Sequence, residues 1–161
     1  MIHYRAMEQK VVSNTTPIIT LLKISEFELL QKLFGKIIIP TGVYEEIEAG
    51  KSKKFYLDLK NIDWIEIRNV KETRELLIDL DKGEAETILL AKEINANYVI
   101  IDEKLGRKYA NYFDLKVIGT LGILKEAKKR DLIKDLKEIV NKMKENNIWL
   151  SKKIIDDIFN N

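Results

Sequence analysis

The sequence contains no cysteine and only one histidine, His3. Without cysteine the chain has no thiol nucleophile, and zinc ribbons and iron–sulfur clusters are excluded. A lone histidine near a chain end, where disorder is common, is a poor basis for serine–histidine–aspartate catalysis or a histidine-rich zinc site. Any catalysis therefore depends on acidic, basic and hydroxyl side chains. Acid-rich sites favour Mg²⁺ or Mn²⁺, which are hard cations that prefer oxygen ligands.

Long hydrophobic runs are also missing. No apolar run approaches the ~20 residues that a membrane span needs, and residues 1–10 lack the apolar segment of a secretory signal. We therefore expect a cytoplasmic protein without membrane contact. Hydrophobic residues make up 45% of the chain and charged residues 34%, which argues against disorder and against a membrane protein. The net charge of +2 neither requires nor excludes a nucleic-acid partner, because only clustered charge indicates one.

The 161 residues contain no linker rich in proline, glycine or serine and no internal repeat. We therefore expect one domain over residues 1–161, with a core at about 10–133 and a helical extension at about 134–161. Short apolar runs alternate with helical patterns, which indicates an α/β fold, and buried strands joined by helices predict a parallel sheet. Strands are predicted at residues 10–13, 37–39, 64–70, 98–101 and 115–118.

Helix boundaries are indicated by capping residues. Residues 25–28 match a capping box, which predicts a helix that begins at Ser25. Ser151 is a predicted cap between two helices of the C-terminal region. Further helices are predicted after Asn14 and over residues 41–49, 71–80, 84–94, 103–112 and 120–130.

Four polar residues lie at or just after the ends of predicted strands. Asn14 and Asp102 each follow a strand, Glu46 lies in the helix after the second strand, and Glu84 begins a helix. Ligands of parallel sheets bind at the carboxyl ends of the strands. Three carboxylates in one crevice repel each other and raise at least one pKa unless a cation is bound. Bound Mg²⁺ or Mn²⁺ relieves this repulsion and can promote hydrolysis of a phosphodiester.

Each of these residues also has a purely structural interpretation. Asp102 can cap the helix that follows it, and Glu84 can favour the positive end of its own helix. Glu46 can belong to a solvated helix face, and Asn14 can form an Asx-turn. Taken singly, none of the four indicates a functional site, whereas their ordered spacing does.

Four segments, in order, resemble the motifs of PIN domains: residues 11–19, 39–47, 83–88 and 101–107. Residues 119–124 resemble a small, poorly characterised prokaryotic subgroup related to Vap-type toxins. The resemblance covers about residues 11–133. It implies an α/β/α sandwich with a central parallel sheet, a Mg²⁺ or Mn²⁺ site, and ribonuclease activity. It also implies a role like that of Vap-type toxins, which are commonly homodimers silenced by a cognate antitoxin protein.

Carried over by position, the resemblance implies roles for individual residues. The acidic site, catalytic and metal-binding, falls on Asn14, Glu46, Glu84 and Asp102. Supporting positions are Thr15 or Thr16, which can orient the first ligand, and Thr120, which follows the last strand. Glu86 and Glu103 are less favoured substitutes for Glu84 and Asp102.

The first motif departs from the family pattern, because PIN nucleases usually have Asp where this chain has Asn14. An amide oxygen is still a metal ligand, but it carries no charge. The leading hypothesis is a metal-dependent endoribonuclease. The alternative is a PIN fold with a weak or inactive centre that binds RNA or a protein. A nucleotide-binding or phosphotransfer domain is disfavoured, because the sequence lacks the glycine-rich phosphate-binding motifs.

A nuclease must also hold a polyanion. Lys104, Arg107 and Lys108 share one face of a predicted helix, and we predict that they contact RNA phosphates. The alternative is a solvated, salt-bridged surface. Trp64 and Trp149 are interpreted as packing or interface residues rather than as platforms for bases.

Overall fold

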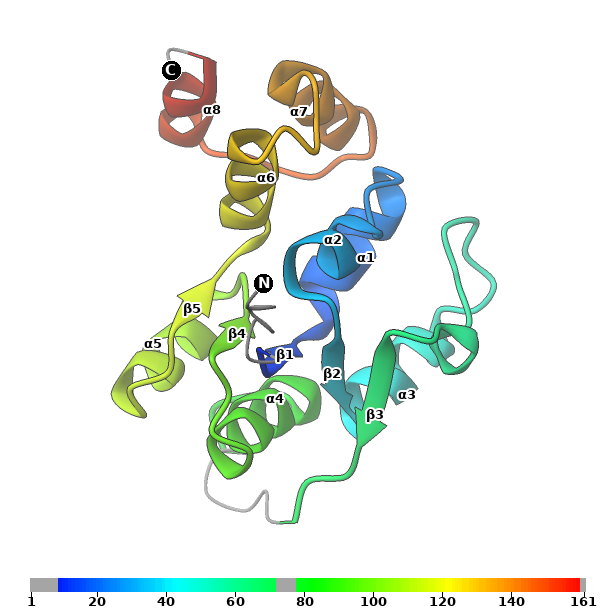
Figure 1. Cartoon of the computed structure of the whole chain (residues 1–161), viewed down its shortest axis with the longest axis vertical. Helices are drawn as coiled ribbons and strands as arrows, with labels where there is room; N and C mark the ends of the chain where they lie inside the picture. The colour runs from blue at the N-terminus through cyan, green and yellow to red at the C-terminus, as the bar shows by residue number, and fades with distance from the viewer. Residues whose placement is uncertain (1–8, 72–77, 160–161) are drawn as a thin grey trace, which may run out of the picture.

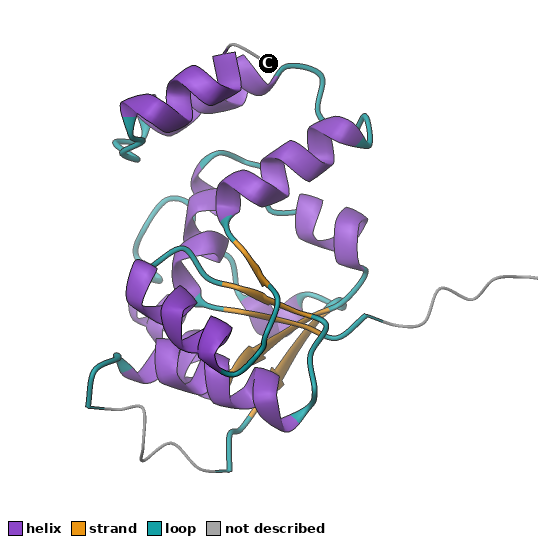
Figure 2. Ribbon diagram, turned by 90° about the vertical axis from the view of Figure 1, so that its left-hand side faces the viewer, coloured by secondary structure: helices purple, strands orange, loops and turns teal. Residues whose placement is uncertain are grey.

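The structure, a computed structural model, describes residues 9–71 and 78–159. These residues form an all-parallel sheet of β1 (Val11–Ser13), β2 (Ile37–Pro40), β3 (Ile65–Arg68), β4 (Tyr98–Ile100) and β5 (Val117–Ile118). The strand order is β3-β2-β1-β4-β5. Helices cover both faces of the sheet (Figures 1 and 2). The predicted α/β/α sandwich with a central parallel sheet is therefore confirmed.

The helices divide between the two faces of the sheet. Two of them, α4 (Lys82–Glu93) and α5 (Lys104–Tyr112), cover one face. The core on the other face includes α1 (Thr15–Lys23), α2 (Leu29–Phe34), α3 (Thr41–Ala49) and α6 (Thr120–Lys129), with the 3₁₀ turn η1 (Leu59–Asn61). The C-terminal helices are α7 (Leu136–Glu145) and α8 (Lys152–Phe159), which lie beyond α6 (Figure 1). Among the described residues, no helix is long and apolar enough to cross a membrane.

Strand β2 shows why the central strands read as continuous apolar runs. Ile37 and Ile39 belong to the core that contains α1, α2 and α6, whereas Ile38 packs in the core beneath α4 and α5. Successive side chains of a strand point to opposite faces. Because both faces are covered by helices, every residue of β2 is buried, and polar alternation is absent.

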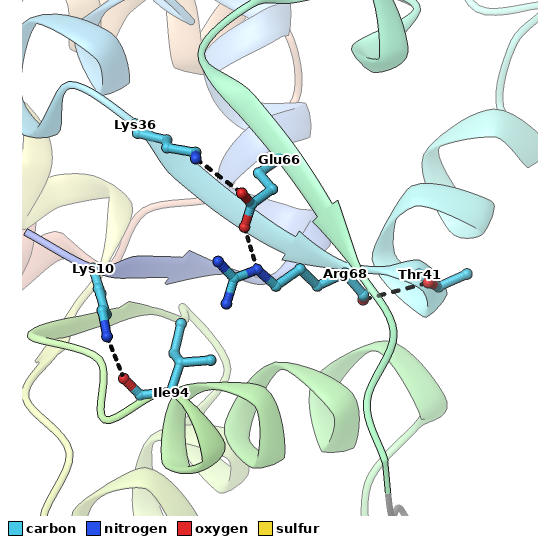
Figure 3. Close-up of polar contacts among 6 residues, drawn as sticks. All are labelled: Lys10, Lys36, Thr41, Glu66, Arg68 and Ile94. Carbon is cyan, nitrogen blue, oxygen red and sulfur yellow. Dashed lines mark hydrogen bonds and ion pairs between the residues drawn. The ribbon is translucent and has the colours of Figure 1, made fainter.

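Polar contacts fix the edge strand β3 against its neighbours (Figure 3). Glu66 on β3 accepts a hydrogen bond from Lys36 at 2.8 Å and forms an ion pair with Arg68. Partial burial raises the pKa of Glu66, but the bonds from Lys36 and Arg68 outweigh it and hold the pKa below its ordinary value. Thr41, at the start of α3, donates to the Arg68 carbonyl at 3.3 Å. The Lys36 contact ties the start of β2 to β3, and the Thr41 contact joins the carboxyl ends of the two strands.

Two predicted helix caps have different outcomes. The prediction that a helix begins at Ser25 is wrong, because Ser25 adopts a φ of +58° and its N–H donates to the Leu22 carbonyl. Ser25 therefore terminates α1, and α2 begins at Leu29. The prediction for Ser151 is confirmed, since its hydroxyl accepts the Ile154 N–H at 3.2 Å. The predicted helix at 71–80 falls largely outside the described residues. His3 also lies outside them.

The strand order reverses at β1, which lies between β2 and β4. Open parallel sheets bind ligands at such a switch point, in the crevice beyond the carboxyl ends of the strands. The backbone N–H of Asn14 donates to the Ile100 carbonyl at 2.9 Å. This bond continues the pairing of β1 and β4 as far as Ile100, the last residue of β4. The residues that follow β1 and β4 are thereby brought side by side.

Candidate acidic site

Asn14 and Thr16, at the start of α1, hold Glu103, which precedes α5. The side-chain amide of Asn14 donates to Glu103 Oε2 at 3.2 Å, and the Thr16 hydroxyl donates to Glu103 Oε1 at 2.6 Å. Asn14 occupies the N-cap position of α1, but its side chain makes no capping bond. The buried amide is therefore directed across the crevice towards a carboxylate.

Glu46 reaches the same region from α3. Its Oε2 accepts a hydrogen bond from the Thr15 hydroxyl at 2.7 Å, although Glu46 otherwise lies on an exposed side of its helix. Gly83, in the first turn of α4, leaves the space for this contact, because a Cβ added there would lie 2.9 Å from Glu46 Oε2. Glycine at residue 83 thus permits the carboxylate to sit between α1 and α4.

Asp102 bonds to the start of α6 rather than to the helix that follows it in sequence. The Thr120 backbone N–H donates to Asp102 Oδ1 at 2.7 Å, and the Thr120 hydroxyl donates to Oδ2 at 2.6 Å. Burial raises the pKa of Asp102 above its ordinary value, although the two bonds from Thr120 oppose that rise. The charge of Glu103 also raises this pKa, whereas the charge of Arg107 lowers it. Gly119 again leaves room, since a Cβ there would lie 2.9 Å from Oδ1.

Glu84 lies near several of the other negative charges of the site. Its backbone N–H donates to Asp81, the N-cap of α4, at 2.8 Å. Burial raises the pKa of the Glu84 carboxyl to about 7, together with a hydrogen bond to Asp81 and the charges of Asp81, Glu103 and Glu46. Of the four residues singled out from the sequence, Glu46 therefore acts directly on Glu84, whereas Asp102 is connected to Glu84 through Glu103.

We call Glu46, Asp81, Glu84, Asp102 and Glu103 the acidic cluster. Glu103 links Glu84 to Asp102, because its negative charge raises the pKa of both carboxyl groups. The sequence favours Glu103 only as a substitute for Asp102, and its motifs do not single out Asp81. The aspartate three residues before Glu84 was a detectable N-cap signal for Asp81.

Glu86 lies apart from the acidic cluster. Its side chain is buried at the contact between α3 and α4, where Oε1 accepts the Gly42 N–H at 3.3 Å. A Cβ on Gly42 would lie 2.3 Å from Glu86 Oε2. This arrangement places Glu86 in helix packing, on a different side of α4 from Glu84.

The donor chemistry of the acidic cluster fits a hard divalent cation, because all its ligand atoms are oxygens. The raised pKa of Glu84 marks negative charge that such a cation relieves. In the parts of the chain that the structure describes, however, no three acidic or histidine side chains are already arranged to hold an ion. The carboxylates instead accept hydrogen bonds from Thr15, Thr16, Asn14 and Thr120.

The three predicted phosphate-binding residues lie directly beside Asp102. Lys104, Arg107 and Lys108 line a cavity of about 400 Å³ together with Asp102 and Asn111. All three basic side chains are exposed, and none forms a salt bridge with another described residue. We call this cavity the basic hollow. It places positive charge next to the acidic cluster.

A family model described as PIN domain matches residues 10–161. Neither the curated proteins nor the solved structures contain a match. The matched range extends through α7 and α8 and so exceeds the range covered by the sequence motifs.

We predict that Glu84 makes the metal-free chain less stable as the pH rises. The folded-state pKa of about 7 lies above the ordinary value of 4.5, so the folded chain binds more protons than the unfolded chain between these values. The contribution of Glu84 to the free energy of unfolding is therefore fully present below about pH 4.5 and is lost as the pH rises through 7.

The measurement is urea unfolding in a chelator from pH 4.5 to pH 8, with Glu84→Gln as the reference variant. We expect the stability of the natural chain to fall relative to the variant over this range. Glutamine keeps a donor towards Asp81 but does not ionise, so the comparison isolates the titration of Glu84 from that of Asp102. A stability difference that does not change with pH contradicts the prediction.

Proposed function

Because this chain belongs to the PIN domain family, whose fold is of the nuclease type, we propose that it is a metal-dependent endoribonuclease that hydrolyses RNA phosphodiester bonds. The observation that carries the proposal is the position of Asp102. Its carboxylate contributes both to the acidic cluster and to the basic hollow. A nuclease needs such a juxtaposition, because the group that reacts is a phosphate anion and the centre that acts on it is acidic.

The acidic cluster would hold Mg²⁺ or Mn²⁺ through Glu46, Glu84 and Asp102. The side-chain amide oxygen of Asn14 would be an uncharged ligand. When bound, such an ion polarises a phosphodiester and lowers the pKa of its water. Thr15 and Thr120 would keep Glu46 and Asp102 in position by the hydrogen bonds they already donate.

Glu103 accounts for the asparagine at residue 14. An aspartate there would face Glu103 as a like charge, whereas the Asn14 amide donates a hydrogen bond to it. We infer that Glu103 supplies the negative charge that the first motif lacks. The cluster would then keep its total charge although the first motif carries an amide.

Lys104, Arg107 and Lys108 would bind the phosphates that flank the scissile bond. Phosphate contacts of this kind position a nucleic acid but carry no sequence information directly. The proposal therefore includes binding of an RNA backbone, and it leaves the sequence of the target open.

We extend the proposal to a cytoplasmic, toxin-like protein that is a homodimer and is silenced by an antitoxin protein. Its support is the family resemblance together with exposed apolar side chains on α5. Leu105 is 42% exposed and Tyr112 is 79% exposed, and both line a hollow of about 320 Å³ with Lys108. Exposed apolar groups of this kind are typical of protein interfaces.

We predict that the purified chain cleaves single-stranded RNA with Mn²⁺ or Mg²⁺ and not with EDTA. Asp102→Asn should lower the rate by more than the ~10- to 100-fold that is typical of disturbing a residue outside the ligand shell of a metal. The control is Asp114→Asn, which changes an exposed aspartate of left-handed conformation and should leave cleavage unchanged. RNA binding in EDTA without cleavage under any metal condition would favour the inactive binding module.

We also predict that Gly83→Ala weakens Mn²⁺ binding without destabilising the fold. The added Cβ would lie 2.9 Å from Glu46 Oε2, and the flexible end of Glu46 can turn away at little cost. Alanine favours a helix over glycine by ~0.5–1 kcal/mol, so stability should hold or rise. We expect roughly a tenfold loss of affinity for Mn²⁺ in calorimetry, the change that follows from disturbing a ligand's position.

The matched control for this experiment is Gly50→Ala, where the nearest atom to an added Cβ is the Ile47 carbonyl at 3.5 Å. This variant should bind Mn²⁺ like the natural chain. If Gly83→Ala keeps full affinity for Mn²⁺ while remaining folded, Glu46 is not among the ligands.

A further inference from the structure

The two tryptophans lie in different surroundings. Trp64 is partly buried and packs against Phe27, with ring centroids 4.8 Å apart, as expected of a packing residue. Trp149 is 84% exposed in the loop between α7 and α8, so it is not packed by the described chain. The packing interpretation therefore fits Trp64 and not Trp149. Tryptophan is enriched at binding interfaces, because its ring is largely apolar while its N–H can meet a polar partner.

Trp149 lines a cavity of about 530 Å³, which is within the size range of small-molecule sites. We call it the C-terminal cavity. Its walls come from β5, α6 and the region of α7 and α8, and they include apolar side chains such as Leu121, Met143 and Ile154. Its other end reaches Asp102 and Arg107. The cavity thus connects the exposed tryptophan to the acidic cluster.

The C-terminal cavity and the basic hollow meet at the same two residues, because Asp102 and Arg107 line both. The basic hollow adds Lys104 and Lys108, whereas the C-terminal cavity adds an aromatic ring and apolar walls. Lys104 and Lys108 therefore line only the basic hollow, Arg107 lines both cavities, and the apolar walls and Trp149 belong to the C-terminal cavity. This division matches the two parts of a nucleotide, an anionic phosphate and a flat base with apolar faces.

The polar groups of the C-terminal cavity agree with this assignment. The lining includes Thr16, Thr20 and Ser151, whose hydroxyls can donate to or accept from the edge of a base or a ribose. The Thr16 hydroxyl already donates to Glu103, and the Ser151 hydroxyl already accepts the Ile154 N–H, so Thr16 keeps an acceptor and Ser151 keeps a donor for a ligand. The mixture of one exposed aromatic ring, apolar walls and short hydroxyl side chains favours a nucleotide.

We propose that the C-terminal cavity binds an unpaired base of single-stranded RNA, stacked on Trp149, while the neighbouring phosphates lie on Lys104, Arg107 and Lys108. The inference rests on the proposed nuclease function and adds a base-binding residue outside the acidic cluster. Paired bases are stacked within a duplex and cannot enter such a site, so the chain would act on single strands, loops or ends. Residues 148–151, which line the cavity, are then part of the substrate site.

The test measures RNA binding in EDTA, so that no cleavage is required. The chain has two tryptophans, and Trp64→Phe therefore leaves Trp149 as the single fluorescent indole. A short single-stranded RNA should change this fluorescence with a saturable dependence on concentration, and a duplex of the same sequence should not. Trp149→Ala in the natural chain should weaken RNA binding roughly 5- to 150-fold, the loss expected from one base–aromatic stack, whereas Trp149→Phe should retain most of the affinity.

The matched control is Ile78→Ala, which removes another exposed apolar side chain, 87% exposed, that belongs to neither the basic hollow nor the C-terminal cavity. It should bind RNA like the natural chain.

The inference is overturned if Trp149→Ala binds RNA with unchanged affinity or if the natural chain binds no RNA. It is also overturned if Trp149 fluorescence responds only to protein concentration, which would indicate a second copy on this surface. Unchanged RNA binding by Trp149→Ala together with metal-dependent cleavage would overturn this inference alone. Trp149-dependent binding without any cleavage would support it and contradict the nuclease.

Discussion

Mutual repulsion among carboxylates at the carboxyl ends of β1 and β4 is the constraint on which this structure depends. The strand order reverses at this point, and so the residues that follow separate strands are forced together. Burial is the largest cause of the raised pKa values of Glu84 and Asp102, and the charges of neighbouring carboxylates raise both further. Without a cation, the fold tolerates the charge because side-chain donors from the first turns of helices hold the oxygens. These donors are Asn14, Thr15, Thr16 and Thr120.

Glycines complete this arrangement. A Cβ at Gly83 or Gly119 would lie 2.9 Å from a carboxylate oxygen of Glu46 or Asp102. Both glycines lie at helix starts, where a side chain would otherwise fill the crevice. The acidic cluster therefore depends on the space that these two glycines leave as well as on the acidic residues themselves. This dependence explains how helices α4 and α6 approach the crevice so closely.

The sequence was sufficient to predict the parallel sheet and the proximity of Glu46 to Glu84, whose pKa is raised by the charge of Glu46. An apolar run such as residues 37–39 is interpretable because burial on both faces leaves no polar alternation. The start of α2 was not predictable, because the same residue types that cap a helix also end one, and only the left-handed φ of Ser25 distinguishes the two. Likewise the spacing alone could not show that Glu103 joins the cluster, since its neighbours Asn14 and Thr16 lie more than 80 residues away in the chain.

The position of Asp102 between two cavities of different character links the fold to the proposed activity. Basic side chains from α5 line one cavity, and the other is an apolar site completed by the residues around α7 and α8. The family match includes these C-terminal helices. We therefore regard the C-terminal region as a contributor to the substrate site in the account proposed here, and no longer only as an extension of the core.

The central claim is that the acidic cluster is a divalent-metal site. Its most direct test is diffraction from crystals soaked in Mn²⁺, with data collected to reveal the anomalous signal of manganese. The account predicts a peak among the carboxylates of Glu46, Glu84 and Asp102, and the loss of that peak in crystals of Asp102→Asn. Saturating Mn²⁺ that gives no peak at this position, or a peak only at acidic residues elsewhere on the surface, would contradict the account.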